Sequence, residues 1–163
     1  MNHKHLSTYL NDHLAGSVAA VELLDHLAST YADSEAGAFA AGMRDEIIAD
    51  RKVLEQLMAD LDISQSKTRQ VSAWVAERLS ALKMRFDDPA LSSLRLFESL
   101  EAISLGLEGQ RSLWIVLKIA SEREPPLRRV DYDHLIRVVE EQRSRVEAKR
   151  LEAGIAMITP EKE

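Results

Sequence analysis

Apolar residues recur every three to four positions along most of the chain, and this spacing constrains the fold more than any other feature. In an α-helix, residues spaced in this way lie on one face, whereas a half-buried strand alternates apolar and polar residues. No run of alternating β-branched residues is present. We therefore expect an all-α protein without a β-sheet. The two clearest apolar stripes are Leu10, Leu14, Val18, Val21, Leu24 and Ala28, and then Phe39, Met43, Ile47, Leu54, Leu57 and Leu61.

Helix-capping residues and prolines divide the chain into segments. Asp33-Ser34 offers an N-cap, Asp88 followed by Pro89 suits a cap and a first helical turn, and Pro125-Pro126 interrupts the pattern. A chain of 163 residues is long enough to bury one sizeable core. We expect a single helical-bundle domain over residues 1–163. The predicted helices are about Leu6–Tyr31, Glu35–Leu61, Lys67–Phe86, Pro89–Ala120 and Asp131–Ile158.

The charge and the composition narrow the classes of partner and location. A net charge of -6 disfavours nucleic acid and anionic membranes as partners. The longest apolar-rich stretch, Leu113–Ala120, is far too short to span a bilayer. The absence of cysteine excludes disulfides and thiolate chemistry. The first ten residues lack the apolar core of a signal peptide, so a cytoplasmic location is expected.

Charged residues interrupt the apolar stripes at several positions. On the second predicted helix, Glu46 lies at the margin of the stripe and Asp50 lies in its middle. The fourth predicted helix is apolar almost all round, so neighbouring helices on both sides would bury Glu101. Arg78 flanks the stripe of the third helix, and Arg143 interrupts that of the last. Since buried ionised carboxylates are costly without a compensating cation, these five residues form the candidate site.

Two long helices, a crossing segment and two further long helices resemble the ferritin-like superfamily. The resemblance implies a ferritin-like up-down four-helix bundle with an additional short helix. Di-iron members place one Glu on each of two helices and a Glu-x-x-His motif on each of the other two. Glu46 could match the Glu of one motif, but Ala49 occupies the histidine position, with Asp50 as a possible substitute ligand. Glu101, or alternatively Glu98, could match a lone bridging Glu.

The second Glu-x-x-His motif is absent from the last predicted helix. Its inward positions hold Val139, Gln142 and Arg143. Because both motif histidines are missing, we expect a degenerate site with no catalytic residue and no cofactor. Iron or manganese bound by Glu46, Asp50 and Glu101 is the alternative.

Two further interpretations account for the inward carboxylates without a metal. In the first, a buried charge network pairs Arg143 with Glu46 and Asp50, and Arg78 with Glu101, because guanidinium binds carboxylates bidentately. In the second, the arginines extend into solvent and the carboxylates lie at a solvated seam. The residues alone leave both open.

The expected function follows from the missing motif residues. We expect a non-catalytic bundle that acts through self-association or a protein partner. A carboxylate-rich redox protein that binds iron or manganese is the alternative. The apolar fourth helix favours a homodimer. Gly106 and Gly109 within this helix predict close packing against a neighbour.

Overall fold

The computed structural model describes residues 1–65 and 92–159, and in these ranges the chain is helical without a strand. The helix predicted over Lys67–Phe86, which would be the additional short helix, lies outside the described residues, as does Arg78. The all-α class is confirmed for the part of the chain that the structure describes. The elements are α1 (His3–Thr30), α2 (Glu35–Asp60), α4 (Ser92–Ser121), the short 3₁₀ helix η2 (Pro125–Arg129) and α5 (Tyr132–Ile158).

Side-chain caps explain where three of these helices begin. Ser34 Oγ accepts a hydrogen bond from the Gly37 amide at 3.2 Å, as the predicted N-cap requires. Asp131 Oδ1 accepts from the His134 amide at 3.0 Å at the start of α5. α1 begins three residues earlier than predicted, because the side chain of Asn2 caps it by accepting from the His5 amide at 3.1 Å.

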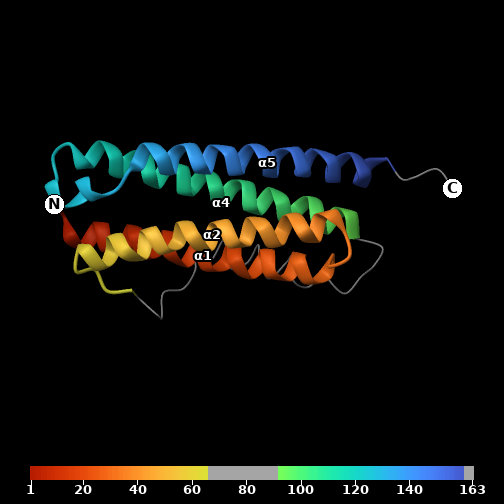
Figure 1. Cartoon of the computed structure of the whole chain (residues 1–163), viewed down its shortest axis with the longest axis horizontal. Helices are drawn as coiled ribbons and strands as arrows, with labels where there is room; N and C mark the ends of the chain where they lie inside the picture. Colours follow the sequence, from red (N-terminus) through yellow and green to blue (C-terminus); the bar gives the residue numbers. More distant parts are fainter. Residues whose placement is uncertain (66–91, 160–163) are drawn as a thin grey trace.

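The four long helices form two antiparallel hairpins, α1–α2 and α4–α5, that lie against each other (Figure 1). α4 starts beside the end of α1, where the Tyr31 hydroxyl donates to the Ser92 carbonyl at 2.6 Å. α4 therefore runs antiparallel to α1 and in the same direction as α2. The directions are up, down, down, up, which differs from the strict alternation of an up-down bundle. The end of α2 and the start of α4 therefore lie at opposite ends of the bundle.

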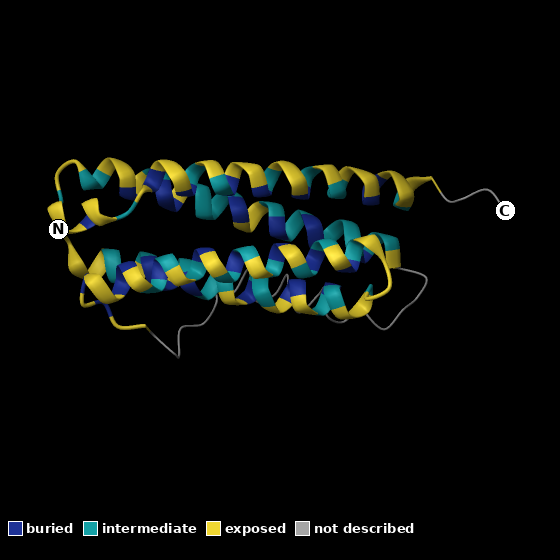
Figure 2. Cartoon of the chain, viewed as in Figure 1, coloured by how far each residue is buried: buried dark blue, intermediate teal, exposed yellow. Residues whose placement is uncertain are grey.

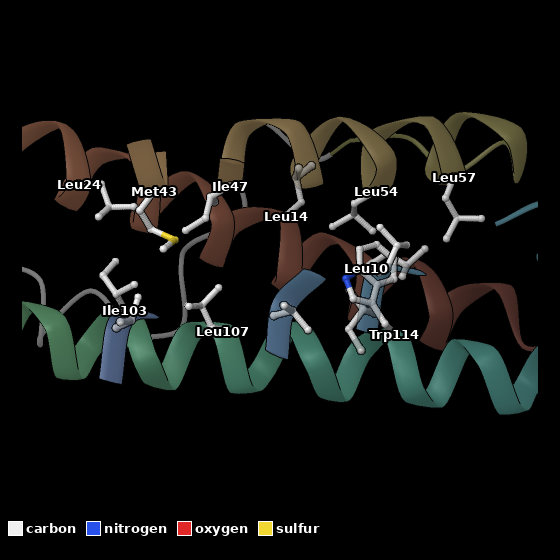
Figure 3. Close-up of a cluster of buried hydrophobic side chains, with 14 of the residues drawn as sticks. Leu10, Leu14, Leu24, Met43, Ile47, Leu54, Leu57, Ile103, Leu107 and Trp114 are labelled. Atoms are coloured by element: carbon white, nitrogen blue, oxygen red, sulfur yellow. The ribbon is translucent and has the colours of Figure 1, made fainter. Parts of the chain in front are cut away.

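The core lies between the two hairpins, where the inward faces of all four helices are buried (Figure 2). Most residues of the two predicted stripes contribute to it, although Val18 is exposed. Trp114 rises from α4 toward the α1–α2 hairpin and packs in this layer (Figure 3). The largest fully buried side chains are Trp114, Leu10, Leu24, Leu27, Met43, Leu57, Met58, Ile103, Leu107, Leu113, Leu117 and Leu127.

Helix α4 is covered on only part of its apolar circumference. It packs mainly on α5 and to a smaller extent on α1. Leu105, Val116 and Ile119 remain exposed, so neighbouring helices do not bury the whole helix. Despite its apolar character, neither α4 nor any other helix in residues 1–65 and 92–159 has the length and hydropathy of a membrane span.

Candidate functional site

Asp50 is the charged residue that the fold buries most clearly among the predicted site residues. It lies in the middle of α2 and is 9% exposed, as its position within the apolar stripe predicts. Its Oδ2 atom accepts two hydrogen bonds, from Gln142 Nε2 of α5 at 2.9 Å and from Gln110 Nε2 of α4 at 3.1 Å. One carboxylate thereby links three helices.

The surroundings of Asp50 favour its protonated form. Burial raises the pKa of the Asp50 carboxyl above the ordinary value of 3.8, because the ionised form loses hydration. The amides of Gln142 and Gln110 act in the opposite direction, and the negative charge of Glu46 raises the pKa further. The folded state therefore binds this proton more tightly than the unfolded state. The stability that protonation contributes is largest at low pH and is lost as the pH rises through the raised pKa.

Glu46, one helical turn earlier on α2, has the opposite environment. Arg145 Nη1 donates to Glu46 Oε1 at 2.8 Å across the α2–α5 contact. Hydrogen bonding from Arg145 lowers the pKa of the Glu46 carboxyl below its usual range. The pair is partly exposed, and pairs of this kind contribute about 0–1 kcal/mol.

The prediction that Arg143 pairs with Glu46 and Asp50 is wrong. Arg143 Nη1 lies 3.0 Å from Glu108 Oε2 of α4, and the arginine that reaches Glu46 is Arg145. Residues two positions apart on a helix point about 200° apart. Arg143 and Arg145 therefore face different neighbours, α4 and α2. Asp50 is held by amides in place of a guanidinium.

Glu101 belongs to a row of ion pairs that joins α4 to α5. Glu101 Oε1 lies 3.4 Å from Arg150 Nη1, whereas its predicted partner, Arg78, is outside the described residues. Surface pairs of this kind are weak individually, and together they match the antiparallel register of the hairpin. The other pairs in the row are Lys118–Asp133, Arg111–Glu140 and Arg143–Glu108.

The structure does not bring Glu46, Asp50 and Glu101 together as a set of metal ligands. Across residues 1–65 and 92–159, no three or more Asp, Glu or His side chains form a group that could hold a metal ion. Each of the three carboxylates instead contacts a side chain of α5, namely Arg145, Gln142 or Arg150.

Both glutamines of the site interrupt the apolar stripe of their helix, although only Gln142 is predicted as an inward residue from the sequence. Gln142 interrupts the apolar stripe of α5, and its burial follows from that position. Gln110 lies within the inward stripe of α4, three residues after Leu107 and four before Trp114, so the same periodicity marks it, and it is half-buried. Gln142 Oε1 is buried and has no hydrogen-bond partner among the described residues.

A cavity of about 240 Å³ adjoins this site, between α1, α2 and α4. Asp50 and Gln110 both line it, so the hydrogen bond between them lies at its wall. Apolar side chains such as Leu23, Ile47 and Leu54 form most of the remaining lining. Trp114 also lines the cavity.

Comparisons with protein-family models, with characterised proteins and with solved structures find no match for this chain. The site therefore has to be interpreted from its own geometry and chemistry.

Proposed function

We propose that the protein is a ferritin-like bundle that acts without a catalytic role, through self-association along the exposed face of α4. The helix directions support the ferritin-like part of the proposal. Bundles of that superfamily have one long crossover connection. Here the α1–α2 and α4–α5 hairpins are joined between opposite ends of the bundle.

The apolar face of α4 is the observation that carries the self-association. Leu105 is 54% exposed, Val116 is 47% exposed and Ile119 is 61% exposed. Together with the exposed Ser112 they lie on one face of α4, with Glu108 and Gly109 between Leu105 and Ser112, and we call this face the α4 strip. An exposed apolar patch of this kind marks a site of protein contact.

The sequence of the α4 strip suits a two-fold axis. Leu105 and Ile119 are each seven residues, or about 10 Å, from Ser112. If two copies of α4 cross antiparallel at Ser112, Leu105 of each copy meets Ile119 of the other. Two-fold interfaces require this reciprocity, in which the same surface serves both subunits. The small side chain of Ser112 allows the two helices to approach closely at the axis.

We expect sedimentation velocity over a range of concentrations to show a monomer–dimer equilibrium. Ile119→Glu should weaken the dimer at least 100-fold, because it places a charge in the apolar contact. Val18→Glu is the matched control, since Val18 of α1 is 39% exposed and lies outside the α4 strip. This variant should dimerise like the parent. A parent that stays monomeric, or an Ile119→Glu variant that still dimerises, would contradict the proposal.

A further inference from the structure

The cavity beside Asp50 has the size and lining of a small-molecule site. Its volume of about 240 Å³ exceeds the 150 Å³ or so at which an engineered apolar cavity binds benzene. Binding pockets for small molecules combine apolar walls with a few convergent polar groups. Here the walls come from α1, α2 and α4, and the polar groups include Asp50, Gln110 and Trp114.

Two buried polar groups of the lining have capacity for a partner from outside the chain. The Trp114 side chain is 1% exposed, yet its Nε1–H has no hydrogen-bond partner among the described residues. Asp50 receives both of its amide hydrogen bonds on Oδ2. A carboxylate has about four acceptor positions on its two oxygens. The Asp50 carboxylate can therefore accept from a donor group of a ligand, whereas the Trp114 Nε1–H, itself a donor, is not satisfied by such a group.

The charges of the lining residues indicate which charge a polar group of the ligand would carry. Among the described residues, the charged side chains of the lining besides Asp50 are Asp12 and Arg51, one of each sign. Arg51 Nε also lies 3.6 Å from Glu55 Oε1. His13 lines the cavity too, and burial lowers its pKa, which favours the neutral ring. The described part of the lining therefore carries two carboxylates and one guanidinium, and Asp50, the more deeply buried carboxylate, receives amides in place of a cation.

We propose that this cavity binds a small apolar amine, whose ammonium group donates to the Asp50 carboxylate while its hydrocarbon part fills the space between α1, α2 and α4. An ammonium group balances the negative charge of Asp50, which no cationic side chain of the described residues contacts by a hydrogen bond. The apolar side chains take up a body of benzene size or somewhat larger. A charge-assisted hydrogen bond is about twice as strong as a neutral one, so charge and size together define the ligand class.

Three probes of one shape and different charge test this at pH 7 by isothermal titration calorimetry on the full chain. They are phenethylamine, phenethyl alcohol and phenylacetate. The amine should bind at one site per chain, at least tenfold more tightly than the alcohol. Phenylacetate should show no saturable binding, because it would place a second negative charge beside Asp50. If the amine does not bind, or binds no more tightly than the alcohol, the proposal is wrong.

Substitutions test separately the contribution of the Asp50 charge and that of the cavity volume. Asp50→Asn should lower the affinity for the amine to that for the alcohol and leave the alcohol unchanged. Gly16 lines the cavity, and a Cβ built there meets no atom within 4 Å, so Gly16→Leu should fill the space and abolish binding of both probes. Gly42→Leu on α2 is the matched control, since a Cβ built at Gly42 also meets no atom within 4 Å and Gly42 does not line the cavity.

Leu105 belongs to both the α4 strip and the lining of the cavity, so the two proposals meet at this residue. The Ile119→Glu variant should bind phenethylamine like the parent, because Ile119 does not line the cavity. Unchanged amine binding in both Asp50→Asn and Gly16→Leu would place the amine elsewhere and overturn the proposal.

Discussion

Replacing Gln142 with Leu is expected to lower the free energy of unfolding at pH 7 by about 1.5–3 kcal/mol, the usual range for a hydrogen bond to a charged group. Gln142 is 0% exposed, and its Nε2 donates to Asp50 Oδ2 at 2.9 Å. The substitution keeps a side chain of similar size but leaves the buried carboxylate with one amide donor. Urea denaturation of the variant and the parent measures the loss.

A surface pair of the same chemistry provides the control for this prediction. Gln56 Nε2 donates to Asp60 Oδ1 at 2.8 Å in an exposed position, so Gln56→Leu should change stability by less than about 0.5 kcal/mol. Adding Asp50→Leu to Gln142→Leu should recover most of the loss, because removing both partners of a buried hydrogen bond can be nearly neutral. If the two substitutions destabilise additively, Asp50 and Gln142 are not coupled.

Gly37→Ala is expected to destabilise the fold by about 1–3 kcal/mol, the typical cost of forcing extra atoms into a packed site. A Cβ at Gly37 would lie 2.0 Å from the backbone carbonyl oxygen of Tyr31. That oxygen also accepts hydrogen bonds from the amide and the hydroxyl of Ser34, so the turn between α1 and α2 would have to move.

Gly42→Ala on the same helix is the control for Gly37→Ala and should have the opposite sign. No atom lies within 4 Å of its added Cβ, and alanine is favoured over glycine in a helix by about 0.5–1 kcal/mol. Thermal melts of both variants provide the comparison. Equal stability of the two variants would show that the contact at Gly37 relaxes without cost.

The elements that could be predicted from the sequence are those set by local chemistry. The apolar period and the Ser34 cap placed α2 within a residue at either end. The inward position of Asp50 followed from the same period. Local signals do not set the direction of α4, because a connection as long as residues 61–91 can end at either end of the bundle.

The partners of the charged residues depend on the relative rotation of whole helices. Arg143 was the expected partner of Glu46 because it interrupts the apolar stripe, whereas the rotation of α5 against α2 places Arg145 there. The cavity could not be predicted for a similar reason. Close packing was expected at Gly106 and Gly109, yet a Cβ at Gly106 meets no atom within 4 Å, and at Gly109 the nearest atom is His13 Cε1 at 4.0 Å. Packing at a small residue depends on the distance between helices, which the sequence does not specify.

Asp50 is a buried carboxylate that the amides of Gln110 and Gln142 stabilise in place of a cationic side chain. The most direct test is an NMR titration of its side-chain carboxyl carbon across the acid range, with Asp50→Asn to assign the resonance. A pKa above the ordinary value of 3.8 is expected, because burial of the charge outweighs the two hydrogen bonds. A pKa at or below 3.8 would contradict the claim, since it would show that a cation or stronger hydrogen bonding compensates the carboxylate.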